Sequence, residues 1–468
     1  MLKRTRLMLV KLWVNPVLFL ITVVAPIALV MVFLVPPFQA PDEHTHFFKA
    51  VQMSEGKLYG HRLGPTLTYP MPVVGDYLPA RYSITTHHYF ITNGHDKVST
   101  AQIKRDIAHP SKDNRPILTP FENTVVYPPL AYAPQAVAIF LTNIMVKTPL
   151  IQMYAARIGS MVVVFALLFL AIRRMPFGKW GVVALAATPM SLLLAASCSG
   201  DAITAGLSVL FIAQVLAAIA NRHKLSKNEI IQMLVVALAL GLCKSPYELF
   251  SLFIFCIPTS RFKDKKTYVR TVGLAVAVPL VLAAAWAASV HGLYINAAVG
   301  SDTSLQAHYT AHHPLGFAHT LASTYFRDAG DYVPRDFIDL SAGLNAPMPL
   351  WFVALSYTFI GLVILAEPIK AATIAGGRYL RQSAALLFVI GFSAVNSLLY
   401  ITFTPVGAKL INGLQGRYFI PFAYLLIPAV GGLLATGSRR YQKLLIYFRC
   451  FVLFTALISF ATIVKRYY

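Results

Sequence analysis

Two acids and two histidines, Asp42, Glu43, His44 and His46, follow directly on the first strongly apolar run of the chain. They belong to the stretch PPFQAPDEHTH, whose first two prolines end a helix because proline lacks the amide hydrogen and clashes with the turn before it. Acids at the mouth of a membrane helix are expensive unless they are solvated or used. A carboxylate held there can take a proton from a hydroxyl group. We therefore predict that Asp42 and Glu43 line an active site at the outer face of a membrane.

Each of these side chains also has a simpler interpretation. Acids stabilise the first turn of the helix that follows them, and Glu43 fits that role alone. The place of Asp42 at the mouth of a span favours catalysis for that residue. His44 and His46 could join the acids around a divalent metal, although a spacing of two residues splits them across a helix. The sequence thus requires no cofactor and leaves a divalent metal open.

The composition indicates a polytopic membrane protein. The 468 residues are 57% hydrophobic and only 12% charged, about half the charged fraction of a soluble protein, and the mean hydropathy is +0.63. The net charge of +22 is explained by Lys and Arg retained in cytoplasmic loops rather than by nucleic-acid binding. The four cysteines fall in or beside apolar runs, which is typical of small core residues rather than of a disulfide set.

The distribution of positive charge predicts how the apolar runs cross the membrane. Basic residues before the first run place the N-terminus in the cytoplasm, and the run is a retained signal anchor because no small-residue cleavage site follows it. Residues 127–145 are expected along the outer interface, because spanning would put Arg173, Arg174 and Lys179 outside. Eleven spans result, at about 16–35, 153–172, 182–196, 202–220, 230–242, 249–257, 269–290, 349–366, 384–403, 418–438 and 444–464. Two basic residues, Lys465 and Arg466, then follow the last span on the outer side, against the positive-inside rule. The number of spans could therefore differ from eleven by one.

This topology divides the chain into five regions. They are the cytoplasmic N-terminus with span 1 (1–37), a first external loop with the acidic motif and interfacial helices (38–150), spans 2–7 (151–290), a second large external loop (291–347) and spans 8–11 (348–468). In the first loop, residues 45–56 predict a short helix. Because a structureless loop of that length would be unusual, the rest is expected to be a packed external subdomain.

Further ionisable residues arrive on the same side as the acidic motif: Asp201, Lys244, Lys409 and Arg417. An acid that serves as general base, with cations that hold a phosphate, is what transfer from a phosphate leaving group requires. Three of these residues also have a simpler role. Asp201 could cap a helix, Lys244 could extend its charged end to the membrane interface, and Arg417 could anchor the chain at that interface.

Three more side chains are candidate substrate contacts: His46, Tyr127 and Tyr247. Tyr127 stands in a Tyr-Pro-Pro stretch that is also explained by structure alone, although an aromatic ring there could stack on a sugar.

Four stretches resemble the DUF2142 family of bacterial membrane proteins. PPFQAPDEHTH resembles its signature, and SGD (199–201), KSPY (244–247) and QGRYF (415–419) resemble further family positions in the same order. The family is similar in plan to the GT-C glycosyltransferases, which have an acidic motif in the first external loop, interfacial helices and many spans. These enzymes take sugars from polyprenyl-phosphate carriers at the non-cytoplasmic face. The SGD stretch departs from the Tyr-Asp or Asn-Asp pair expected at its position.

The resemblance implies an all-α, GT-C-like membrane glycosyltransferase in the bacterial cytoplasmic (inner) membrane, with its active site on the periplasmic or extracellular side. Asp42 would deprotonate the acceptor hydroxyl, while Lys244, Lys409 and Arg417 would bind the phosphate of a polyprenyl-phosphate sugar donor. The acceptor would be a glycan or glycolipid of the cell envelope.

Two alternatives stay open. One is a transporter or flippase of a lipid-linked saccharide, although the sequence has no clear internal repeat. The other is a non-catalytic polysaccharide-assembly protein, which would keep its function without Asp42 and Glu43.

Overall fold

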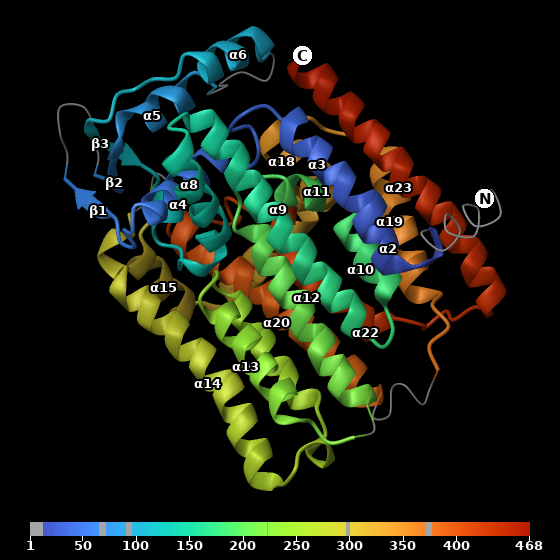
Figure 1. Ribbon diagram of the computed structural model, residues 1–468. Coiled ribbons are helices and arrows are strands. Elements are labelled where there is room, and N and C mark those ends of the chain that lie inside the picture. The colour runs from blue at the N-terminus through green and yellow to red at the C-terminus, as the bar shows by residue number, and fades with distance from the viewer. Residues whose placement is uncertain (1–12, 65–71, 90–95, 222, 296–299, 371–376) are drawn as a thin grey trace, which may run out of the picture.

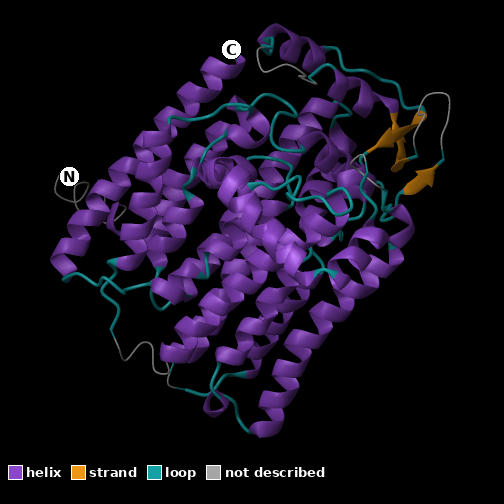
Figure 2. Ribbon diagram, turned by 180° about the vertical axis from the view of Figure 1, so that it is seen from behind, coloured by secondary structure: helices purple, strands orange, loops and turns teal. Residues whose placement is uncertain are grey.

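The computed structural model describes residues 13–64, 72–89, 96–221, 223–295, 300–370 and 377–468. The described chain is mostly helical, and its helices form a bundle with a small three-stranded sheet at one end (Figures 1 and 2). The predicted helical membrane protein is therefore confirmed, whereas the sheet was not predicted.

Six helical stretches in the described residues are long and apolar enough to cross a bilayer. They are Pro16–Leu34, built from α2 (Pro16–Phe19), the π-helical η1 (Leu20–Val24) and α3 (Ala25–Leu34); α9 (Pro149–Arg174); α12 (Asp201–Ala220); α14 (Lys265–Ser289); Tyr379–Phe403 within α20 (Gly377–Phe403); and α23 (Ser438–Tyr467). Each coincides with an expected span. In the most apolar 18-residue stretch of α12, 89% of the residues are buried, so α12 is the central helix of the bundle.

The other five expected spans are shorter or broken. They correspond to α10 (Lys179–Ala186) with α11 (Pro189–Ala195), α13 (Lys227–Gly241), the 3-10 helix η3 (Tyr247–Cys256), α19 (Leu350–Leu365), and α21 (Ile420–Ala423) with α22 (Leu426–Val430). Proline cannot donate to the preceding turn, so Pro189 begins a new helix after the break instead of continuing α10. A multi-pass bundle is thus shown, while the count of eleven stays a prediction.

Helix α23 runs alongside the first span in the same direction. Arg449, in the first half of α23, donates to the carbonyl oxygen of Trp13, and the hydroxyl of Tyr468 donates to the carbonyl oxygen of Leu34. The amide of Val98, in the predicted first external loop, donates to the carbonyl oxygen of Tyr467 in the last turn of α23 at 2.8 Å. The end of α23 therefore lies on the side of that loop, as an odd number of spans requires.

The described part of residues 38–150, the predicted first external loop, is a packed subdomain. Its elements are α4 (Glu43–Ser54), β1 (His61–Leu63), β2 (Val73–Pro79), α5 (Ala80–His87), α6 (Thr100–Ala108), β3 (Pro116–Pro120), α7 (Glu122–Val125), η2 (Leu130–Tyr132) and α8 (Ala133–Met145). The strands pair antiparallel in the order β1-β2-β3, with Gly75 opposite both His61 and Pro120. Helix α4 confirms the helix predicted for residues 45–56, and α8 packs along α9.

The described part of residues 291–347, the predicted second external loop, is mostly helical. It contains η5 (His291–Leu293), α15 (Thr303–His312), α16 (Pro314–Ser323), η6 (Thr324–Asp328), α17 (Ala329–Ile338) and α18 (Ser341–Leu344). Outside this loop, the short 3-10 helix η4 (Thr259–Arg261) lies before α14. Helix α17 packs on the 3-10 helix η8 (Gly416–Phe419). A Cβ atom on Gly416 would lie 2.1 Å from the carbonyl oxygen of Val333, so only glycine fits this close approach. The second loop thereby supports the segment that carries Arg417.

Candidate active site

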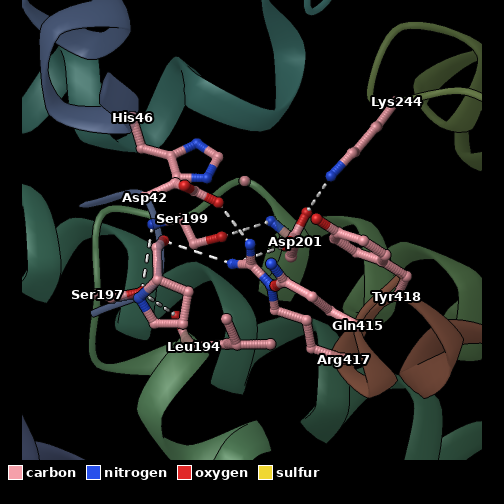
Figure 3. Close-up of polar contacts among 12 residues, drawn as sticks. Asp42, His46, Leu194, Ser197, Ser199, Asp201, Lys244, Gln415, Arg417 and Tyr418 are labelled. Atoms are coloured by element: carbon pink, nitrogen blue, oxygen red, sulfur yellow. Dashed lines mark hydrogen bonds and ion pairs between the residues drawn. The ribbon is translucent and has the colours of Figure 1, made fainter. Parts of the chain in front are cut away.

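Four ionisable side chains from distant parts of the chain meet beyond the end of the first span (Figure 3). Arg417 donates from Nη2 to Asp42 Oδ2 at 2.5 Å, and Lys244 donates from Nζ to Asp201 Oδ1 at 2.9 Å. Arg417 Nη1 also lies 3.7 Å from Asp201 Oδ2. Acids and bases alternate in the order Asp42, Arg417, Asp201, Lys244, a set that we call the ionic chain. The structure thus brings together four of the residues that the sequence placed on one side of the membrane.

Each member of the ionic chain lies shortly before a helix or within its first two residues. Asp42 precedes α4 in the left-handed conformation, with φ 54° and ψ 18°. Asp201 is the first residue of α12, where the helix dipole favours a negative charge, and its amide donates to Ser199 Oγ at 3.1 Å. Lys244 lies between α13 and η3, and Arg417 lies in η8. The site is therefore assembled from four separate segments.

The members of the ionic chain differ in their access to solvent. The side chain of Asp42 is 40% exposed, against 1% for Arg417, 9% for Asp201 and 15% for Lys244. Burial raises the pKa of Asp42, but the charge and hydrogen bond of Arg417 outweigh it, and the pKa lies below its usual value. Burial lowers the pKa of His46 to about 4, against the opposing effect of Asp201 and Asp42. Near neutral pH, Asp42 is therefore a carboxylate and His46 is uncharged.

Aromatic rings surround the buried cations and the histidine. Lys244 Nζ lies 4.7 Å from the ring centre of Tyr127 and 5.1 Å from that of Tyr418. His46 Nδ1 is 2.7 Å from the hydroxyl oxygen of Tyr132, and the two rings stack at 5.6 Å. Ring faces stabilise a nearby cation.

An apolar cavity of about 30 Å³ ends on the ionic chain. Helices α9, α10, α11, α12 and α21 contribute its walls, with these lining residues: Val164, Phe165, Leu168, Ala186, Ser191, Leu194, Ala195, Asp201, Ala202, Ala205, Gly206, Tyr247, Arg417, Ile420, Pro421 and Tyr424. Among the described residues, none donates a hydrogen bond to the buried Asp201 Oδ2. Arg417 thus meets an apolar cavity on one side and Asp42 on the other.

Comparison with known proteins places the chain in a family. Residues 27–426 match the family described as "Predicted membrane protein (DUF2142)". The chain belongs to the DUF2142 family. No curated protein and no solved structure matches the chain significantly. All four residues of the ionic chain lie inside the DUF2142 match.

Glu43 lies apart from the ionic chain. Its carboxylate is fully buried, and both of its oxygens accept hydrogen bonds from Arg157 in α9. It therefore has no oxygen facing a substrate, and the geometry favours a structural role for this residue. Arg157 was missed from the sequence, although an arginine inside an apolar run was a visible signal.

The remaining candidates divide between the site and the surface. The hydroxyl of Tyr247 donates to the carbonyl oxygen of Tyr418 at 2.7 Å, so Tyr247 belongs to the site. Gln415, which was not predicted, accepts from Arg417 Nε at 2.6 Å. Lys409 is exposed and lies outside the cavity lining. Among the described residues, no three His, Cys, Asp or Glu side chains are grouped to hold a metal ion.

Proposed function

We propose that this protein is a GT-C-type glycosyltransferase of the bacterial cytoplasmic membrane, acting at its periplasmic or extracellular face. It transfers a sugar from a polyprenyl-phosphate-linked donor to a glycan or lipid of the cell envelope. One observation carries the proposal: an apolar cavity ends on the buried cation Arg417, and a half-exposed carboxylate, Asp42, lies on the other side of that cation. The cavity of about 30 Å³ has room for only about two water molecules, so a lipid chain would have to separate its apolar walls. A phosphate suits the cation, and an acceptor hydroxyl suits the exposed acid.

The proposed reaction is a single displacement with inversion. Asp42 accepts the proton of the acceptor hydroxyl, whose oxygen forms a bond to the anomeric carbon of the sugar. The bond between that carbon and the phosphate oxygen breaks, and polyprenyl phosphate leaves with the electron pair. Arg417 and Lys244 stabilise the charge that develops on the phosphate, since both are buried where electrostatic interactions are strong. Glu43 and Lys409 have no step in this reaction, because Glu43 is fully buried against Arg157 and Lys409 is exposed and is not a member of the ionic chain.

A transporter or flippase is the second candidate function, favoured by one specific observation. Broken helices line the cavity, with Ala186 and Ser191 on either side of the α10–α11 break and Ile420 from α21. Discontinuous helices around a substrate site are typical of secondary transporters.

The test of the transferase is the variant Asp42→Asn. Wild-type and variant protein are reconstituted with radiolabelled polyprenyl-phosphate sugars and an envelope extract, and transfer to the extract is counted. We expect a loss of about 100-fold to 10,000-fold, because that is the usual contribution of general base catalysis. Bound polyprenyl phosphate, measured by mass spectrometry of the purified protein, should be unchanged. Asp113→Asn, which alters an acid paired with exposed Arg115 in the same external loop, is the matched control.

Wild-type transfer by Asp42→Asn would refute the base assignment. The transporter is tested in liposomes that contain lipid-linked sugar but no acceptor. Movement of the sugar across the bilayer there, without transfer in the first assay, would replace the enzyme by the transporter.

A further inference from the structure

Arg157 is wholly buried in α9 and uses all five of its N–H donors. Nε and Nη2 donate to the two carboxylate oxygens of Glu43 at 2.7 and 2.6 Å. Nη1 donates to the carbonyl oxygens of Val32 and Val35 at 2.7 and 2.8 Å, and Nη2 donates to that of Pro36 at 2.9 Å. A guanidinium group has five N–H bonds, so no donor remains for water or a ligand. Arg157 therefore acts only on the segments that it contacts.

The three carbonyl groups belong to the end of the first span. A helix end leaves its last carbonyl oxygens without partners inside the helix. The oxygen of Val32 would normally accept from the amide four residues later, but Pro36 has no amide hydrogen. Arg157 donates to all three carbonyl oxygens, of which that of Pro36 also accepts from the amide of Gln39 at 3.4 Å, and it thereby fixes the point at which the chain leaves the span.

Glu43 connects this fixed point to both acids of the ionic chain. It directly follows Asp42, whose positive φ is disfavoured for a residue with a Cβ atom and persists only where the surroundings impose it. Glu43 Oε1 also accepts from the amide of Cys198 at 3.1 Å, in the turn that leads into Asp201. One ion pair therefore joins the end of the first span, the start of α4 and the turn before α12.

We propose that Arg157 and Glu43 are positioning residues, which hold the turns of Asp42 and Asp201 in register on either side of Arg417. This inference rests on the proposed function, because it names what places the general base. Stability alone explains the pair poorly. Well-packed apolar residues often replace a buried ion pair without loss of stability, and the membrane makes charges more expensive.

The test compares two variants with wild type. The double variant Arg157→Met with Glu43→Gln removes the ion pair without leaving an unpaired charge. The variant Arg157→Lys keeps the positive charge but cannot donate two parallel hydrogen bonds to the carboxylate of Glu43. For the double variant we expect kcat to fall about 100-fold, the effect of a misplacement near 1 Å, with the KM for the lipid-linked donor unchanged. Arg157→Lys should lie between the double variant and wild type. Amide hydrogen exchange should accelerate in residues 36–46.

A matched control removes the ion pair at the far end of α4, whose side chains are 43% and 30% exposed. Lys57→Met with Glu55→Gln should change neither the turnover nor the exchange of residues 36–46.

The outcomes separate this inference from the proposed function. Wild-type kcat in a folded double variant would overturn it, and so would equal losses in the control. If the double variant does not fold, the same comparisons are made with Arg157→Lys. If wild-type protein transfers no sugar, the proposed function fails, and exchange alone decides. Faster exchange confined to residues 36–46 then supports the positioning role, and unchanged exchange overturns it.

Discussion

The ion pair between Asp201 and Lys244 should be strongly coupled, and a double-mutant cycle can measure this. The perturbations are Asp201→Asn, Lys244→Met and the two together. Only 9% and 15% of these side chains are exposed, so water screens their interaction weakly. Removing one partner of a buried pair costs about 3–5 kcal/mol, mainly because the other charge is left without compensation. Asp201→Asn should be the more harmful change, since Asp201 also faces Arg417 at 3.7 Å.

The double variant should lose less stability than the sum of the single variants. We expect a coupling energy of about 2 kcal/mol, within the usual range for residues in contact. The assay is unfolding by denaturant in one detergent, followed by tryptophan fluorescence. Asp113 and Arg115 provide the matched cycle, because they approach to 2.7 Å with the arginine 82% exposed. Such a surface pair is worth about 0–1 kcal/mol. A coupling at Asp201 and Lys244 no larger than in this control would refute the reasoning.

Three further predictions concern pH and packing. Transfer by the wild-type protein should stay level from about pH 8 to about pH 5, because the pKa of Asp42 is lowered and that of His46 is about 4. An acid limb near pH 6 in the rate profile would contradict this. The pKa of His46 in the folded state lies below its value in the unfolded state, so its contribution to the free energy of unfolding is complete above about pH 6.5 and is lost as the pH falls towards 4. The variant His46→Gln should not show this loss. Gly416→Ala should weaken the binding of a polyprenyl monophosphate at least about tenfold (about 1.4 kcal/mol). The new Cβ would lie 2.1 Å from the carbonyl oxygen of Val333, and the backbone would have to shift and displace Arg417. The control Gly437→Ala, whose Cβ would have no atom within 4 Å, should bind normally.

That Asp42 and Arg417 lie on one side of the bundle could be predicted from sequence, because one physical rule acts on every loop separately. Positive charge marks the cytoplasmic side, so each loop can be assigned a side without knowledge of its neighbours. The rule placed Asp42, Asp201, Lys244 and Arg417 together, as the structure does. It placed Lys409 there as well, because it resolves sides of the membrane and not positions within one side.

What depends on pairing between distant residues could not be predicted. Glu43 is separated from Arg157 by 114 positions, and no local pattern names that partner. The sheet was missed for the same reason, since β1 has only three residues and gains its identity from β2. The break before Pro189 was visible in principle, because proline marks the start of a new helix.

The backbone at Asp42 limits how its chemistry can be probed. Aspartate and asparagine are the side-chain-bearing residues that best tolerate a left-handed conformation, and alanine does not share that tolerance. Replacement by alanine at this position would therefore remove the carboxylate and change the backbone of the loop together. The loss of activity in that variant could not be assigned to either cause. Asparagine keeps the shape and the backbone preference while removing the charge, so it alone among simple replacements separates the two.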